Sequence, residues 1–96
     1  MHVITRKRLN EFARDHPDAL SALEHWYRAM KTNRFANFAQ LRQMFPNADQ
    51  VGDKTVFNIG GNRYRLIAAL HYNRARVYIR AILTHRDYDK GTWKQS

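Results

Sequence analysis

Apolar residues recur three and four positions apart through the first half of this 96-residue chain. Leu9, Phe12 and Ala13 have this spacing, which predicts an amphipathic helix over residues 6–15. Pro17 ends that helix, because the residue before a proline avoids helical backbone, and Pro17 itself suits the first turn of a second helix. The same periodicity predicts two further helices, over residues 17–31 and 38–45.

Alternating apolar and polar positions replace this periodicity in the second half of the chain, and alternation is typical of strands. Three strands are expected, over residues 50–59, 63–72 and 76–83. Gly52 and Asp53 bend the first of them, and Val3 and Ile4 form a short strand before the first helix. This order predicts an α+β single domain over residues 1–96, with N-terminal helices packed on one face of a mainly antiparallel sheet.

The most informative strand follows a turn at Gly60 and Gly61. Arg63 and Arg65 lie two positions apart there, so the pleat should place both guanidinium groups on one face of the sheet. In the last strand one face is expected to carry Tyr78, Arg80 and Ile82, and the other Val77, Ile79, Ala81 and Leu83. A guanidinium binds phosphate oxygens through parallel hydrogen bonds, so a phosphate-binding face with Arg63, Arg65 and Arg80 is predicted.

The positive charge of the chain is large and unevenly distributed. The formal net charge is +9. Residues 1–53 contain eight Lys/Arg and six Asp/Glu, net +2, whereas residues 54–96 contain nine and two, net +7. A basic surface over the predicted sheet favours a polyanionic partner such as nucleic acid, although a merely solvated face would have the same composition.

A second polar cluster follows the last predicted strand, where His85, Tyr88 and Lys90 carry groups that can move protons. Cleavage of RNA needs a base for the 2′-hydroxyl, a proton for the leaving 5′ oxygen and cations around the phosphate. His85 is the natural proton carrier, because an imidazole titrates near neutral pH. Asp87 and Asp89 are expected to orient neighbouring groups, since a carboxylate repels phosphate.

Other side chains could contact RNA without reacting with it. Asn58 and Asn62 could hydrogen-bond to sugars or base edges, and the aromatic candidates for base stacking are Tyr64, Tyr78 and Trp93. Structural roles are the alternative: the strand arginines could pair with nearby carboxylates, His85 could cap a strand end, and Tyr88 could be a packed ring.

Several classes of protein do not fit the sequence. There is no cysteine, so disulfides and thiolate chemistry are impossible. The five histidines lack metal-ligand spacing and no Ser lies in a nucleophile elbow, so we expect no metal, no cofactor and no acyl-transfer chemistry. Neither a signal peptide nor a run of roughly 20 apolar residues is present, so a cytoplasmic protein without a membrane partner is expected.

Four segments carry a family resemblance, namely MHVIT at residues 1–5, FANFAQLR at 35–42, VFNIGGNRYRLI at 56–67 and YIRAILTHRDYD at 78–89. Through them the chain resembles the HigB family of type II toxins, within the RelE-like group of bacterial mRNA interferases. The last two segments are the specific ones. The resemblance implies a compact RelE-like domain and a metal-independent endoribonuclease that cuts mRNA on the translating ribosome and inhibits translation.

The resemblance also implies partners and site residues. It implies a HigA-type antitoxin with a helix-turn-helix domain, whose complex with the toxin binds operator DNA, and contacts with ribosomal RNA. By position in the motifs, the expected catalytic residues are Arg65, Arg80, His85 and Tyr88. The expected RNA-binding residues are Lys54, Asn58, Asn62, Arg63, Arg86 and Lys90. Either His85 or Tyr88 could take the 2′-hydroxyl proton.

Two other functions fit the same residues. A non-catalytic module that binds RNA or the ribosome would use the arginines without a proton carrier. A gyrase-inhibiting toxin of the ParE type would share the scaffold, induce the DNA-damage response and leave mRNA intact. An antitoxin could neutralise the protein by covering the basic face or by blocking its docking on the ribosome.

Overall fold

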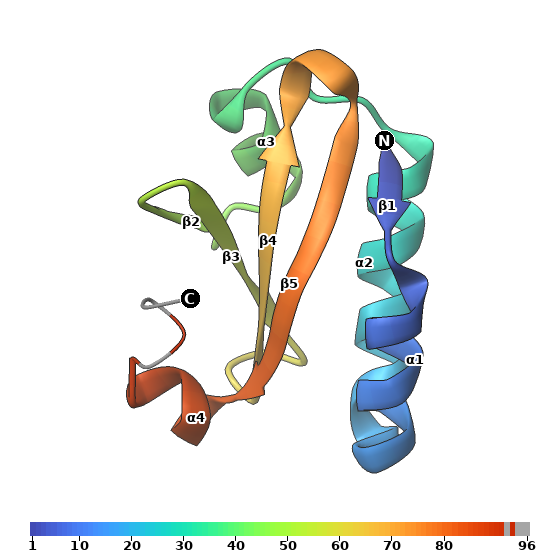
Figure 1. Ribbon diagram of the computed structural model, residues 1–96, viewed down its shortest axis with the longest axis vertical. Coiled ribbons are helices and arrows are strands. Elements are labelled where there is room, and N and C mark those ends of the chain that lie inside the picture. The colour runs from blue at the N-terminus through green and yellow to red at the C-terminus, as the bar shows by residue number, and fades with distance from the viewer. Residues whose placement is uncertain (92, 94–96) are drawn as a thin grey trace.

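The structure is a computed structural model and describes residues 1–91 and 93. Within these residues the chain forms a five-stranded sheet in the order β1–β5–β4–β3–β2 (Figure 1). The strands are β1 (His2–Ile4), β2 (Asp49–Val51), β3 (Lys54–Ile59), β4 (Tyr64–His71) and β5 (Arg76–Thr84). The α-helices are α1 (Arg6–Asp15), α2 (Leu20–Thr32), α3 (Phe38–Met44) and α4 (His85–Asp89).

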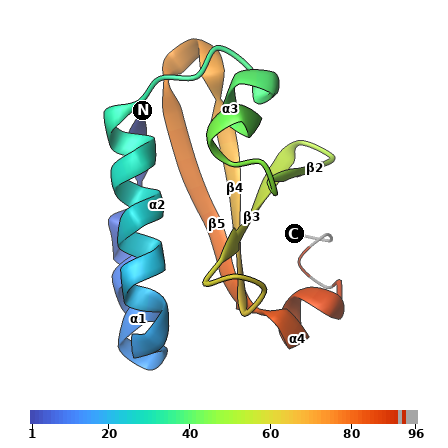
Figure 2. The ribbon, with the colours of Figure 1, turned by 180° about the vertical axis from the view of Figure 1, so that it is seen from behind.

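The chain crosses the sheet once and then returns across it. It starts at one edge with β1, passes through α1, α2 and α3, and enters the opposite edge at β2. Hairpins then lead through β3 and β4 to β5, which lies parallel to β1 and antiparallel to β4. The first three helices cover one face, seen from the helical side in Figure 2. The predicted α+β class with a mainly antiparallel sheet is therefore confirmed.

Local signals fixed most element boundaries. α1 has the predicted bounds, and Pro17 opens a short 3₁₀ turn, Pro17–Ala19, that leads into α2. The strand predicted at residues 50–59 is instead two strands, because the chain reverses between β2 and β3. Gly52 adopts φ +63° at this reversal, a left-handed backbone conformation that glycine enters without steric cost. The helix α4 was not predicted.

The main core lies between the helices and the sheet. Its fully buried side chains alternate along the strands and recur at helical spacing in α1–α3; they include Leu9, Leu23, Trp26, Met30, Leu41, Phe57, Leu66 and Val77. Trp26 and Phe57 meet edge to face with ring centres 5.5 Å apart. Burial of this apolar surface supplies most of the driving force for folding and holds the sheet as a rigid platform. Among the described residues, none of the helices is long and apolar enough to cross a lipid bilayer.

A β-bulge interrupts the ladder between the two longest strands. Ile67 pairs with Ala81, but Ala68 pairs with Ile79, so Arg80 is an extra residue of β5. A bulge shifts the alternation of side chains by one position and re-aims the extra side chain.

This shift reverses the predicted faces of the residues beyond Arg80. Ile82 packs against the helix-facing core, whereas Ala81 and Leu83 pack on the opposite face of the sheet. The prediction for these three side chains is therefore wrong, because periodicity read along one strand carries no information about an extra residue in the pairing. On that opposite face a smaller apolar cluster forms around Val56, Ile67 and Trp93.

Candidate active site

Arg65 and His85 meet where β5 leads into α4. The Nη2 atom of Arg65 lies 3.3 Å from Nδ1 of His85, and Nε2 of His85 lies 3.1 Å from Oδ2 of Asp89. A guanidinium has only donors, so a hydrogen bond from Arg65 makes Nδ1 the acceptor and assigns the ring proton to Nε2, which faces the carboxylate. We refer to Arg65, His85, Tyr88 and Asp89 as the Arg65 cluster. The arrangement defines both the tautomer and the orientation of the imidazole.

Backbone contacts fix His85 at the first residue of α4. The side chain of Thr84 accepts a hydrogen bond at 3.2 Å from the N–H of Asp87, which caps the helix. The N–H of His85 donates to the carbonyl of Arg63 at 3.0 Å. Because His85 and Asp89 are four residues apart, this single helical turn brings the imidazole and the carboxylate to one face. Asp89 thus contacts His85, as the expected orienting role requires.

The guanidinium of Arg65 is held by the turn that precedes β4. Its Nη1 atom donates to the carbonyl of Asn62 at 3.1 Å and to that of Tyr64 at 3.2 Å. Its Cζ atom lies 5.4 Å from the centre of the Tyr88 ring. The side chain is half-buried, so the cation is positioned before any ligand binds while one edge stays accessible.

Tyr88 is supported from behind by Trp93. The two rings stack with centres 5.2 Å apart and an angle of 16° between their planes, and Nε1 of Trp93 donates to the carbonyl of Tyr88 at 3.1 Å. Trp93 is 8% exposed and packs against Val56 and Ile67. The expectation that Trp93 stacks on bases is therefore wrong, since its ring belongs to the wall that positions Tyr88.

Arg63 lies outside the Arg65 cluster. It belongs to the turn before β4, and its Nη1 atom lies 3.1 Å from Oδ2 of Asp18, in the 3₁₀ turn on the helical side. The prediction that Arg63 and Arg65 share one face is wrong, because the pleat begins only at Tyr64. Tyr64 is buried, and its hydroxyl contacts Asp18, so it is no platform for a base either.

The contact between Asp18 and Tyr64 changes the acidity of both groups. Hydrogen bonding from the Tyr64 hydroxyl holds the pKa of the Asp18 carboxyl below its usual value, with Arg63 adding to the effect. The same hydrogen bond raises the pKa of the Tyr64 phenol. Asp18 lies too far along the chain for sequence periodicity to associate it with this site, and no motif pointed to it.

Arg80 lies beside a different ring. Its Cζ atom is 5.5 Å from the centre of the Tyr78 ring, and its carbonyl accepts a hydrogen bond at 3.0 Å from Nη1 of Arg8 in α1. Leu83, which pairs with Arg65, is three residues further along β5. The structure thus places Arg80 on the sheet beside Tyr78 rather than in the Arg65 cluster.

The asparagines predicted to bind RNA lie close to the Arg65 cluster. Asn58 pairs directly with Arg65 across the β3–β4 ladder and is exposed. Asn62 lies in the turn, where its carbonyl already accepts from Arg65. Directly paired residues of an antiparallel ladder are neighbours on the same face, so Asn58 is available to a ligand that Arg65 holds.

The remaining cations predicted to bind RNA lie on β3 and at α4. Lys54 begins β3, four residues before Asn58, and its Nζ atom lies 3.5 Å from Oδ1 of Asp53. Arg86 is exposed on α4, and the Nζ atom of Lys90 lies 3.7 Å from Oδ1 of Asp87. These side chains contribute to the positive field around the Arg65 cluster.

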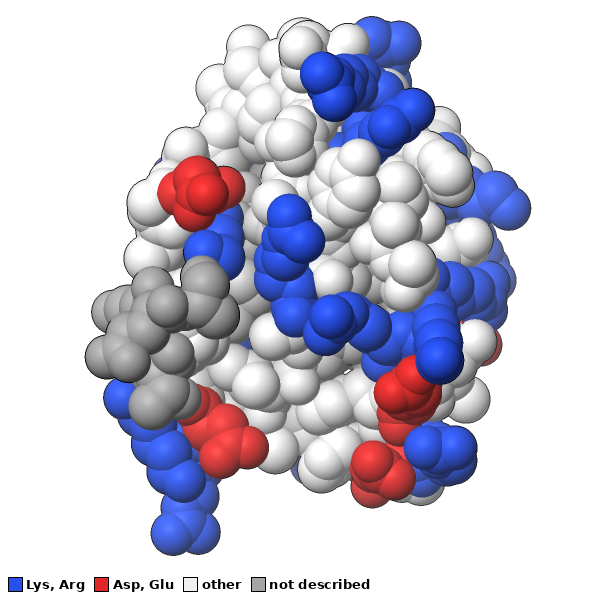
Figure 3. All heavy atoms as spheres, viewed as in Figure 1, with Lys and Arg blue, Asp and Glu red and all other residues white. Residues whose placement is uncertain are grey.

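Positive charge gathers on the face opposite the helices. Figure 3 shows Lys and Arg atoms running across the middle of this face and along one side, with acidic atoms away from its centre. Residues 64–84, which form β4, β5 and their connection, contain four Arg and neither Asp nor Glu. A polyanion can therefore approach this face of the sheet without meeting a carboxylate from these two strands.

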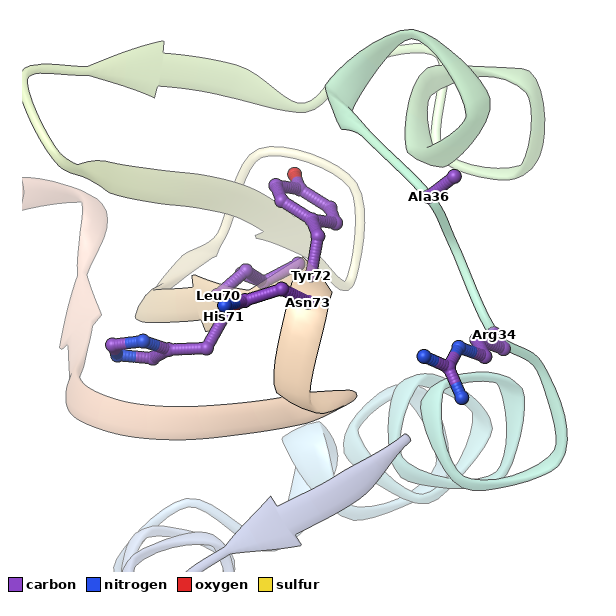
Figure 4. A pocket seen from close by; sticks show the side chains of 6 residues that line it. All are labelled: Arg34, Ala36, Leu70, His71, Tyr72 and Asn73. Carbon is purple, nitrogen blue, oxygen red and sulfur yellow. The ribbon is translucent and has the colours of Figure 1, made fainter.

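A hollow of about 590 Å³ lies at the other end of the sheet, where the α2–α3 connection faces the β4–β5 connection (Figure 4). It is lined by Arg34, Ala36, Leu70, His71, Tyr72 and Asn73. None of these residues belongs to the Arg65 cluster. The cluster itself lies on an open surface, as suits a long polymer rather than a small molecule.

Comparison with known proteins identifies the family of this chain. Residues 19–91 match the sequence model of a family described as HigB_toxin, RelE-like toxic component of a toxin-antitoxin system. The chain belongs to the HigB toxin family. The resemblance to HigB proteins is therefore confirmed, and the Arg65 cluster lies wholly within the matched residues.

Similar proteins within the HigB family cover nearly the whole chain. An mRNA interferase HigB of Escherichia coli strain CFT073 is 34% identical over 95 residues, which cover 96% of this chain and 92% of the relative. The mRNA interferase HigB of Shigella flexneri is 32% identical over 92 residues, covering 93% of this chain and 88% of the relative.

Proposed function

We propose that this HigB-family protein is the toxin of a type II toxin–antitoxin system and an endoribonuclease that cleaves mRNA. The observation that carries the proposal is the position of His85 between a cation and a carboxylate. Arg65 supplies positive charge for a phosphate, and His85 supplies a proton acceptor whose orientation is fixed by Asp89. The names of the similar HigB proteins, each an mRNA interferase, support the same activity.

The hydrogen bonds of the free protein support the following reaction steps. When a phosphate binds, Arg65 turns its Nη2 donor from His85 to a phosphate oxygen and so frees the Nδ1 lone pair. Nδ1 then takes the proton of the 2′-hydroxyl, O2′ bonds to phosphorus, and the bond from phosphorus to the 5′ oxygen breaks. Asp89 stabilises the imidazolium that forms, as a carboxylate does for a catalytic histidine.

The leaving 5′ oxygen must gain a proton for the reaction to balance. We assign this proton to the hydroxyl of Tyr88, which then regains one from solvent. The products are a 2′,3′-cyclic phosphate and a 5′-hydroxyl end. No metal enters these steps, because Arg65 provides the cation and His85 with Tyr88 the proton transfers.

The wider setting is also part of the proposal. An open, basic cluster suits mRNA held in an extended form, as on the translating ribosome, and cleavage there would inhibit translation in the cytoplasm. We propose a HigA-type antitoxin as the neutralising partner, whose complex with this chain binds operator DNA through the antitoxin. Family membership supports an antitoxin of some kind.

Mapping the ends of cleaved RNA tests the proposed function. Purified protein is added to ribosomes programmed with an mRNA, and new 5′ ends are detected only after treatment with a polynucleotide kinase, as 5′-hydroxyl ends require. The His85→Ala variant should bind these ribosomes but cut the mRNA about 10²- to 10⁴-fold more slowly, the usual contribution of a general base. Intact mRNA with the wild-type protein, both in this assay and in cells expressing it, would refute the proposal.

A further inference from the structure

His71 and Tyr78 form an aromatic pair on the sheet face that carries the Arg65 cluster. Their ring centres are 5.1 Å apart and the rings meet edge to face. His71 is exposed and Tyr78 partly so. In Figure 4 the His71 ring points away from Arg34 and Ala36, although His71 also lines the hollow between them. With Arg80 over the Tyr78 ring, these three residues make a site that we call the Tyr78 platform.

The bulge in β5 explains why Arg80 belongs to this platform. Because Arg80 is the extra residue of the ladder, its side chain does not follow the alternation of faces along β5. Its carbonyl accepts a hydrogen bond from Nη1 of Arg8. Its guanidinium therefore lies against Tyr78 and not beside His85. Aromatic rings next to an Arg on an uncovered sheet face form a typical stacking surface for bases of single-stranded RNA.

Apolar side chains lie between the platform and the Arg65 cluster. Ala69 pairs with Tyr78, and Ala81 pairs with Ile67 on the way toward Thr84. The six steps along the chain from Tyr78 to Thr84 span about 20 Å at 3.3 Å per step. That distance accommodates several nucleotides of an extended strand, which would pass over the apolar side chains of Ile67, Ala81 and Leu83.

We propose that the Tyr78 platform is a second binding site for the RNA strand that is cleaved at the Arg65 cluster. One base stacks on the Tyr78 ring against His71, and Arg80 binds an adjacent phosphate. The proposal rests on the proposed function, since it concerns the same RNA substrate. The platform anchors the strand some nucleotides from the scissile phosphate and so makes binding depend on strand length.

Binding of short and long RNA to the same variants tests this site. The probes are a dinucleotide and a longer single strand of mixed sequence that can cross the sheet, both made uncleavable by 2′-O-methylation. Tyr78→Ala should raise the Kd of the longer strand about 5- to 150-fold, the usual effect of removing a base-stacking ring. The Kd of the dinucleotide should not change, and Tyr78→Phe, which keeps the ring, should bind both probes like wild type.

Tyr27→Ala is the matched control. Tyr27 is a partly exposed tyrosine of α2 with the Cζ of Arg6 4.4 Å from its ring centre, but it lies on the helical side. The Tyr27→Ala variant should therefore bind the longer strand with the same Kd as wild type. Because Tyr78→Ala could disturb the sheet, His71→Ala at an exposed position provides a second variant, and it should weaken binding of the longer strand in the same direction.

The outcomes separate this inference from the proposed function. If His71→Ala and a folded Tyr78→Ala bind the longer strand as tightly as wild type, or if Tyr27→Ala weakens it as much, the platform is refuted. Cleavage of mRNA by the wild-type protein would still stand in that case. A wild-type protein that cuts no mRNA would instead refute the proposed function.

Discussion

The hydroxyl of Tyr64 lies 2.8 Å from both carboxylate oxygens of Asp18, 46 positions earlier in the chain. This contact ties the 3₁₀ turn before α2 to the turn before β4, which Arg63 reinforces through its own contact with Asp18. The turn before β4 also presents two carbonyl groups to the cluster. The Asn62 carbonyl accepts from Arg65, and the Arg63 carbonyl accepts from the N–H of His85. Asp18 therefore positions the Arg65 cluster from the opposite side of the sheet without touching it.

Replacing Asp18 with asparagine should lower stability in a pH-dependent way. The pKa of Asp18 is depressed in the folded protein, chiefly by the Tyr64 hydrogen bond, so the unfolded chain binds this proton more tightly. The ionised Asp18 carboxylate stabilises the fold fully at pH values above 3.8, the usual pKa of this carboxyl. This stabilisation is lost as the pH falls through the depressed pKa of the folded protein. We expect Asp18→Asn to have a lower Tm than wild type at neutral pH.

Thermal unfolding across the acid range measures this effect. The difference in Tm between wild type and Asp18→Asn should shrink as the pH falls below 3.8. Asp15→Asn is the control, because it removes an exposed carboxylate from the end of α1 in the same region. A Tm difference for Asp18→Asn that stays constant down to low pH would contradict the assignment of its stabilising effect to the ionised carboxylate.

Arg65 and Arg63 should differ sharply in their effect on cleavage. Arg65→Ala removes the cation beside His85 and should lower kcat about 10²- to 10³-fold, as loss of one stabilising donor at a developing charge does. Arg63→Ala removes a side chain that contacts Asp18, so cleavage should fall far less while Tm decreases. Cleavage rates on programmed ribosomes compare the two, and equal losses would show that both guanidinium groups act on the phosphate.

Local signals in the sequence were enough to predict most of the fold. The apolar spacing of α1 and the proline that follows it act over a few residues, so the boundaries of α1 could be predicted. The helix α4 also had a local signal, Thr84 followed three positions later by Asp87, the pattern of a capped helix start. Its short length and its place directly after a strand hid it from the periodicity.

The predictions from sequence were wrong where distant parts of the chain meet. No Gly or Pro marks the bulge at Arg80, because the extra residue is defined only by the pairing of β5 with β4. The position of Arg63 depends on its contact with Asp18, 45 positions earlier. The alternation of residues along a strand gives no information about such a contact. The neighbours Arg65 and His85 could be proposed as site residues from their motifs, but their hydrogen bond is a tertiary contact, 20 positions apart.

Tyr88 allows its hydroxyl and its ring to be tested separately. Tyr88→Phe keeps the ring between Arg65 and Trp93 but removes the group that would protonate the 5′ oxygen. We expect this variant to lose kcat about 10²-fold or more while its KM and Tm stay near wild type. Tyr88→Ala should lose kcat and also destabilise the fold. Wild-type kcat for Tyr88→Phe would assign the second proton to another donor.

The salt dependence of RNA affinity should report which basic side chains contact phosphate. For single strands, the slope of log K against log salt is about −0.7 per phosphate contact. Arg80→Ala should therefore make the slope shallower by about 0.7 for an uncleavable strand that spans the sheet, because Arg80 is exposed on the basic face. Arg14→Ala removes an exposed cation from α1 and should leave the slope unchanged. If both variants change the slope equally, the strand is held by net charge alone and follows no defined path across β4 and β5.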